Sequence, residues 1–225
     1  MLIVIEGLDG SGKSTQVKKI RSFLQERVDS LKYIHFPRYE APLYGGLISE
    51  FLRGDFGGND AVHPKLVALL FAEDRHGAAA EISRALDCGA TVLLDRYVYS
   101  NIAYQCAKLR DEDARASLRD WIFDTEYRQF GIPRPDLNIF LDVPISFVSS
   151  KLSSKRQGGD REYLHGAADI HEADISFQKK VRQMYMEQCS LDSGFIRVDC
   201  ADKDGGMLPA EEIFQKLKEQ LEKVL

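Results

Sequence analysis

The glycine-rich segment near the N-terminus constrains the fold of this chain more than any other feature. It runs from Gly7 to Thr15 as GLDGSGKST and matches the pattern G-x-x-x-x-G-K-[ST]. The apolar residues 2–5 predict a buried strand just before it, and the apolar spacing over residues 13–27 predicts a helix just after it. Strand, loop and helix in this order are the context that a phosphate-binding loop requires.

In a loop of this kind, main-chain N–H groups and the positive end of the following helix surround phosphate oxygens. Lys13 is placed to reach the β- and γ-phosphates, and the Ser14 hydroxyl is placed to meet Mg²⁺. We therefore expect the chain to bind a nucleoside triphosphate together with Mg²⁺. The expected contacts are Gly7, Leu8, Gly10, Ser11, Gly12, Lys13, Ser14 and Thr15.

Apolar runs and segments of helical period alternate along the rest of the chain. Further strands are expected at residues 31–36, 90–94, 137–143 and 195–198. Further helices are expected at residues 43–53, 64–86, 99–107, 113–130, 145–152, 173–189 and 210–224. Because the strands are apolar throughout, the pattern predicts an α/β fold with a five-stranded parallel sheet covered by helices on both faces.

Length and composition indicate one globular domain, residues 1–225, with a polar and basic loop or lid at about 153–168. Hydrophobic residues make up 44% and charged residues 29%, which excludes disordered and fibrous classes. The net charge of −5 predicts a surface that repels nucleic acid and anionic membranes, and no apolar run approaches the roughly twenty residues of a membrane span. Four widely spaced cysteines indicate reduced thiols in a cytoplasmic protein.

The third expected strand ends in Asp95-Arg96, and the carboxyl ends of parallel strands border the ligand crevice. Asp95 could hold a metal-bound water and Arg96 could clamp a phosphate, or the two could form a simple ion pair. Phe71 and Arg75 share a helix face, either as an aromatic plane beside a cationic donor or as a core residue beside a surface one. No histidine falls in a triad or metal spacing, so we expect structural or surface positions for His35, His63, His76, His165 and His171.

Several motifs, in order along nearly the whole chain, make the sequence resemble the thymidylate kinase family. They are Glu6–Gln16, Phe36–Arg38, Leu70–Arg75, Asp95–Ser100, Ala103–Gln105, Pro135–Leu137 and Phe140–Pro144. The resemblance implies a P-loop nucleoside monophosphate kinase architecture with a lid. It also implies phosphoryl transfer from ATP to dTMP, giving ADP and dTDP for dTTP biosynthesis, with Mg²⁺ and in a homodimer.

The resemblance also implies roles for single residues. Asp9, inside the phosphate loop, would bind the sugar 3′-OH of dTMP and position the phosphates, although a carboxylate there repels a triphosphate. Phe71 would stack on thymine, Arg75 would bond the base carbonyl, and Arg96 would hold the acceptor phosphate. Tyr163 would close over the deoxyribose and help to exclude a 2′-hydroxyl. A base pocket and a phosphate-binding turn would complete the acceptor site, at Ser100, Asn101 and Gln105 and at Phe36, Pro37 and Arg38.

Members of the family differ in where an additional catalytic cation lies. The loop position that carries it in one type is Gly10 here, whereas the segment 153–168 contains Lys155, Arg156 and Arg161. The chain therefore resembles the type with cations in the lid, which implies a catalytic role for Arg156 or Arg161 without deciding between them. A solvated charged loop is the other interpretation.

Two rival functions follow from the same loop. A deoxynucleoside kinase would need a carboxylate base beside the sugar 5′-OH, and Glu6, directly before the loop, is not where such a base is expected. The second rival is a nucleotide-binding protein that keeps the fold without turnover. The presence of Lys13, Ser14, Asp95 and Arg96 argues against it.

Overall fold

The chain folds around a parallel sheet, seen in a computed structural model that describes residues 1–153 and 159–225, with main chain alone at residues 159–161. The strands are β1 (Leu2–Gly7), β2 (Leu31–His35), β3 (Thr91–Asp95), β4 (Leu137–Asp142) and β5 (Phe195–Asp199). They run parallel in the order β2-β3-β1-β4-β5. The predicted five-stranded parallel sheet is confirmed.

The central strand β1 carries the phosphate loop at its carboxyl end. All residues of β1 and of its neighbours β3 and β4 are buried, which explains why their sequences are mostly apolar rather than alternating. The register pairs Ile5 of β1 with Asp95 at the end of β3. The phosphate loop and the Asp95-Arg96 step, far apart in the sequence, therefore leave the sheet side by side.

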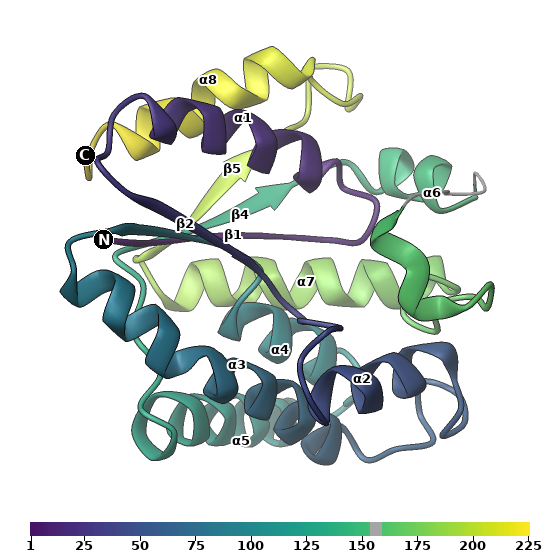
Figure 1. Ribbon diagram of the computed structural model, residues 1–225. Coiled ribbons are helices and arrows are strands. Elements are labelled where there is room, and N and C mark those ends of the chain that lie inside the picture. The colour runs from purple at the N-terminus through teal and green to yellow at the C-terminus, as the bar shows by residue number, and fades with distance from the viewer. Residues whose placement is uncertain (154–158) are drawn as a thin grey trace.

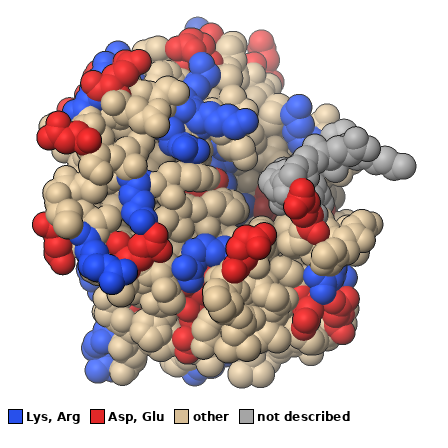
Figure 2. Space-filling view, viewed as in Figure 1, with Lys and Arg blue, Asp and Glu red and all other residues tan. Residues whose placement is uncertain are grey.

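Helices cover both faces of the sheet, as predicted. They are α1 (Lys13–Gln25), α2 (Tyr44–Arg53), α3 (Pro64–Asp87), α4 (Val98–Cys106), α5 (Glu112–Phe123), α6 (Ile145–Ser153), α7 (Ile175–Leu191) and α8 (Ala210–Leu221). Figure 1 shows α1 and α8 on one face and α3, α4, α5 and α7 on the other. Within the described chain, no helix is long and apolar enough to cross a membrane. On the face seen in Figure 2, acidic and basic side chains are interspersed.

The predicted helix 113–130 differs from the observed structure. Helix α5 ends at Phe123, and the chain continues as a π-helical turn, η1 (Asp124–Gln129). A π-helical turn spaces its hydrogen bonds one residue further apart than an α-helical turn, and such turns are frequent at functional sites. In η1, Thr125 and Glu126 are both buried.

A second, smaller apolar cluster lies beside the main core and joins α2 to α3. Its buried members are Ile48, Phe51, Leu52 and Val67. The ring of Tyr163 packs against this cluster from η2 (Gly159–Leu164), a 3₁₀ segment within the predicted lid. The cluster thus attaches the described part of the lid segment to the helices that flank the site.

Candidate active site

A cavity of about 540 Å³ opens at the carboxyl ends of the strands, a volume typical of small-molecule sites. Gly7, Thr15 and Arg38 are not among its lining residues, and Arg156 and the side chain of Arg161 lie outside the described part of the chain. The other predicted site residues all line it: Leu8, Asp9, Gly10, Ser11, Gly12, Lys13, Ser14, Phe36, Pro37, Phe71, Arg75, Asp95, Arg96, Ser100, Asn101, Gln105 and Tyr163.

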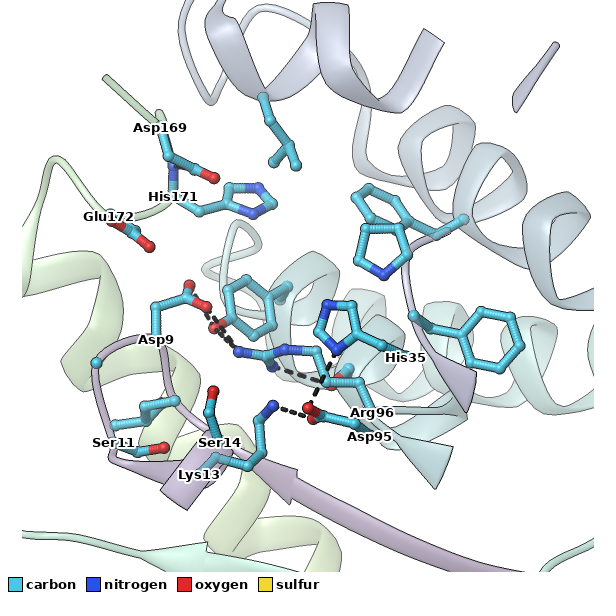
Figure 3. Close-up of a pocket in the computed structure, with 18 of the residues that line it drawn as sticks. Asp9, Ser11, Lys13, Ser14, His35, Asp95, Arg96, Asp169, His171 and Glu172 are labelled. Atoms are coloured by element: carbon cyan, nitrogen blue, oxygen red, sulfur yellow. Dashed lines mark hydrogen bonds and ion pairs between the residues drawn. The ribbon is translucent and has the colours of Figure 1, made fainter. Parts of the chain in front are cut away.

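The phosphate loop has the geometry of an anion site. Its main chain has a positive φ at Gly10 (71°) and Gly12 (76°), a conformation in which any other side chain would be strained. Gly12 caps α1 without a side-chain hydrogen bond, so the first N–H groups of the helix are available to an anion. The Ser11 hydroxyl is buried without a partner among the described residues, and the Ser14 hydroxyl points into the cavity (Figure 3).

An ion pair between Lys13 and Asp95 joins the loop to the end of β3 (Figure 3). Oδ2 of Asp95 accepts a hydrogen bond from the Tyr33 hydroxyl at 3.3 Å and lies 3.1 Å from Nδ1 of His35. Burial is the largest single influence and opposes the charge on Asp95, but Lys13 and His35 together outweigh it and hold the pKa of this carboxyl well below its usual range. Burial lowers the pKa of the Lys13 ammonium, and Asp95 opposes that shift.

A second pair, Arg96 with Asp9, spans the cavity beside the first. Nη2 of Arg96 donates to Asp9 Oδ1 at 2.6 Å, and Asp9 Oδ2 accepts from the Tyr104 hydroxyl at 2.7 Å and from Gln178 Nε2 at 3.1 Å. Burial opposes the charge on Asp9, yet Arg96 and these hydrogen bonds lower its pKa. Arg96 has a φ of 68°, a strained conformation of the kind found at functional sites.

Glu6 explains how α4 is held against the loop. Its carboxylate accepts from the main-chain N–H groups of Tyr97 (2.9 Å) and Ser100 (3.1 Å), from the Ser100 hydroxyl, and from the Tyr185 hydroxyl (3.1 Å). It is fully buried, which raises its pKa, and it does not line the cavity. Glu6 therefore fastens the fold and is not placed to act as a base toward a ligand.

The far end of the cavity presents an aromatic ring and a set of fixed polar groups. Phe71 lies against Phe51 edge to face, with ring centroids 6.5 Å apart. Nδ2 of Asn101 donates to the carbonyl oxygen of Ala68 and to Glu126, each at 2.9 Å. The oxygen Oδ1 of Asn101 is buried without a partner among the described residues, as is Oε1 of Gln105. Both oxygens are buried acceptors on side chains that line the cavity.

Comparison with known proteins gives the family. A family model described as thymidylate kinase matches residues 5–205. The chain belongs to the thymidylate kinase family. The thymidylate kinases of Mycobacterium tuberculosis strains CDC 1551 / Oshkosh and ATCC 25618 / H37Rv are each 35% identical over 212 residues, which cover 93% of this chain and 96% of theirs. A solved thymidylate kinase structure from Candida albicans aligns with a TM-score of 0.69 at 30% identity, covering 99% of this chain and 91% of that one.

Membership of the thymidylate kinase family confirms the predicted enzyme class, a phosphotransferase, and supports ATP-dependent phosphorylation of dTMP. Nothing in these comparisons favours the two rival functions. The Candida match also confirms the predicted nucleoside monophosphate kinase fold.

One predicted phosphate ligand of this family site points elsewhere. Arg38 forms an ion pair with Asp74 of α3, with Nε 2.9 Å from Oδ1, and it also donates to the Asp74 carbonyl oxygen at 2.6 Å. The next residue, Tyr39, lines the cavity instead and stacks on Tyr163 with centroids 3.8 Å apart. Tyr163 in turn donates to Asp169 Oδ2 at 2.8 Å.

Sequence reasoning missed several lining residues, namely Tyr33, His35, Tyr39, Leu52, Tyr104, Lys151, Asp169, His171 and Glu172. Two of them, His35 and His171, belong to the histidines expected at structural or surface positions. Burial lowers the pKa of His171 to about 3 and raises that of Asp169 to about 7. Only Tyr104 had a sequence signal, because it lies in the motif Ala103–Gln105.

The donor atoms fit Mg²⁺, which the family uses with ATP. The Ser14 hydroxyl and the Asp95 carboxylate both line the cavity, and both are the oxygen ligands that Mg²⁺ prefers. Among the described residues there is no group of three or more His, Cys, Asp or Glu side chains that could hold a metal by themselves.

Proposed function

We propose that this chain transfers the γ-phosphoryl group of ATP to the 5′-phosphate of dTMP, with Mg²⁺, in the cavity described above. The observation that carries the proposal is the arrangement of this one cavity. A phosphate loop with Lys13 lies at one end, groups that could read a base lie at the other, and the Asp9–Arg96 pair lies between them. The acceptor phosphate would bind at Arg96, facing the γ-phosphate held by the loop.

Phosphoryl transfer to dTMP needs no strong general base. The attacking group is a phosphate that is already an anion, so alignment and neutralisation of charge supply the catalysis. Lys13 and Arg96 would place positive charge on the two sides of the transferred group, and the α1 N–H groups would hold the phosphates of ATP. Ser14 and Asp95 would hold Mg²⁺, which would neutralise further phosphate charge when bound.

The base end of the cavity complements thymine. Thymine presents a donor at N3–H and an acceptor at O4, and here Asn101 Oδ1 is an acceptor and Arg75 is a donor. Phe71 would stack on the base, and Gln105 Oε1 offers a further acceptor. Cytosine carries the opposite pattern at these two positions, so it would meet acceptor with acceptor and donor with donor.

We further propose that residues 1–225 act as one domain in which the segment 153–168 is a lid. Closure would bring Arg156 or Arg161 to the transferred phosphoryl group, where Gly10 offers no charge. The Tyr39–Tyr163 stack on the cavity wall supports a role for Tyr163 over the deoxyribose.

We also propose a homodimer and a cytoplasmic location. On α3, Leu66 is 62% exposed and Leu69 is 36% exposed, one turn apart on the same face. An exposed apolar stripe of this kind suits a self-complementary contact between two copies. The four cysteines are free thiols, which supports a reducing compartment.

A coupled assay of ADP release tests the activity. It would compare dTMP, dUMP, dCMP, dAMP and dGMP as acceptors, with thymidine as the unphosphorylated control. We expect the highest kcat/KM for dTMP and no turnover of thymidine. Lys13→Ala should abolish turnover, while Lys18→Ala, on the exposed side of the same helix, should leave it unchanged. A higher kcat/KM for another nucleotide would refute dTMP as the substrate, and no ADP release at all would favour the non-catalytic rival.

A further inference from the structure

Glu126 does not touch the cavity, yet it binds both side chains that would read the nucleobase. We propose that Glu126 is a positioning residue that decides which atoms of Arg75 and Asn101 face the base, and thereby the preference for thymine over cytosine. The inference rests on the proposed function, since it names the group that controls recognition in the same site.

Both oxygens of the Glu126 carboxylate accept hydrogen bonds from Arg75 or Asn101. It is fully buried, and Oε2 accepts from Arg75 Nε at 2.5 Å. Its other oxygen, Oε1, accepts from Arg75 Nη2 at 2.7 Å and from Asn101 Nδ2 at 2.9 Å. A buried ion pair is weak evidence for a stabilising role, because desolvation offsets much of the attraction. Stability alone therefore does not explain why a buried Arg75–Glu126 pair is present at this place.

An amide can face a partner in either of two ways, and Glu126 selects one of them. The two groups around Asn101 Nδ2 are the Glu126 carboxylate and the Ala68 carbonyl, and both are acceptors only. Turning the amide over would place its oxygen against both of them. Nδ2 is therefore held in the protein interior, and Oδ1 is left as the acceptor of this amide that has no partner among the described residues, on a side chain that lines the cavity.

The same carboxylate orients Arg75. The planar fork of the guanidinium uses Nε–H and one N–H of Nη2 against Glu126, so the donors left for a ligand in the cavity are the outer ones, on Nη1 and the second N–H of Nη2. One acceptor and one donor are thus set by a single buried group. Together they match N3–H and O4 of thymine and oppose the reversed pattern of cytosine.

The π-helical turn places the Glu126 carboxylate inside the protein, whereas the other acid of the same turn, Asp124, lies outside. Asp124, in the same turn, is exposed at its side chain and pairs with the exposed Arg128. One turn therefore holds a buried acid that contacts the base-reading pair and an exposed acid that does not. Asp124→Asn is the matched control for substitutions of Glu126.

Two substitutions, Glu126→Gln and Glu126→Ala, should weaken the positioning of Arg75 and Asn101 to different extents. In Glu126→Gln, the best placement keeps an oxygen at Oε1, which preserves the contacts with Arg75 Nη2 and Asn101 but sets an amide donor against Arg75 Nε. In Glu126→Ala, Arg75 loses its carboxylate partner and Asn101 Nδ2 keeps only the Ala68 carbonyl as a partner, so the Asn101 amide turns over more easily. We therefore expect kcat/KM for dTMP to fall at least tenfold in Glu126→Gln, mainly through KM, because the phosphates are held by other residues. The ratio of kcat/KM for dTMP over dCMP should fall in Glu126→Gln and further in Glu126→Ala.

The measurement is steady-state ADP release with dTMP and dCMP for the wild type, both Glu126 variants and Asp124→Asn, with circular dichroism and urea unfolding as folding controls. Glu126→Gln keeps the volume and two of the three hydrogen bonds, so it carries the test even where Glu126→Ala does not fold. Equal losses for dTMP and dCMP, with an unchanged ratio in Glu126→Gln, would mean a merely structural pair and would overturn the inference. A wild type that does not prefer dTMP would instead overturn the proposed function, so the two failures are distinguishable.

Discussion

Replacing His171 by Phe should make the protein more stable, and more so at acid pH. The imidazole is 5% exposed and lies among the rings of Phe51, Tyr104 and Phe177, with centroids 5.6, 5.1 and 5.5 Å away. Its Nε2 is buried without a hydrogen-bond partner among the described residues. A phenyl ring has the same general shape and suits this aromatic surrounding, so the substitution removes an unpaired polar atom at little packing cost.

The size of the effect has two parts. An unsatisfied buried polar group costs about 1–3 kcal/mol, and that part is present at every pH. The second part comes from the pKa of His171, which burial first and the Lys108 charge next lower to about 3. Above pH 6.5 the imidazole is neutral in both states, but below it the unfolded chain takes up a proton that the folded chain refuses. At pH 5.5 this costs the wild type about 1.4 kcal/mol of stability, and His171→Phe should recover it.

Urea unfolding, followed through circular dichroism at pH 7.5 and pH 5.5, measures both parts in one pair of proteins. The pKa of Asp169, raised by burial to about 7, acts in the opposite direction, because the folded state then holds a proton that the unfolded state lacks. That contribution is present in both proteins and largely cancels in their difference. If His171→Phe is no more stable than the wild type at pH 7.5, and the difference does not grow at pH 5.5, the imidazole is solvated and the reasoning fails.

Three further predictions concern catalysis and assembly. Asp9→Asn keeps an acceptor for Arg96 but loses the charge, and it should lower kcat/KM for dTMP at least tenfold, about 1.4 kcal/mol, with an unchanged circular dichroism spectrum; unchanged turnover would exclude a role in the site. The double variant Arg156→Ala, Arg161→Ala should lower kcat about 10²-fold at saturating substrates, whereas Arg128→Ala should not, and a near-wild-type kcat in the double variant would refute the lid cation. Leu66→Glu should shift sedimentation from dimer to monomer, and a monomeric wild type would remove the basis for the homodimer.

The sheet was predictable because buried parallel strands leave a simple mark on the sequence. Strands covered on both faces are apolar throughout, and each is followed by a segment of helical period. The turn η1 left no such mark, because residues 124–129 have the composition of an ordinary helix end. What distinguishes it is the pairing of Glu126 with Arg75 of α3, a contact between distant parts of the chain.

The site divides in the same way. The phosphate loop and Asp95-Arg96 were predictable because each follows a strand, and parallel strands end at one edge of the sheet. Arg38 could not be placed from the sequence, since its direction depends on Asp74 of a distant helix. His171 was missed because its burial and its neighbours arise only when the segment after the lid folds back over α4.

Three ion pairs among the described residues at the cavity differ in the exposure of their side chains, and the difference matches the two roles proposed for their cations. Side-chain exposure is 8% and 4% in Lys13–Asp95, 11% and 21% in Arg96–Asp9, and only 3% and 0% in Arg75–Glu126. A cation that must bind phosphate has to share or exchange its carboxylate partner, which is easiest where that partner already reaches the cavity, as Asp9 does. A cation that binds a neutral base needs a fixed orientation and does not have to exchange its carboxylate partner for a phosphate. A fully buried carboxylate holds it in that orientation. On the proposed function, the cations that would bind phosphate are therefore paired with carboxylates that line the cavity, and the cation that would read the base is paired with one that does not.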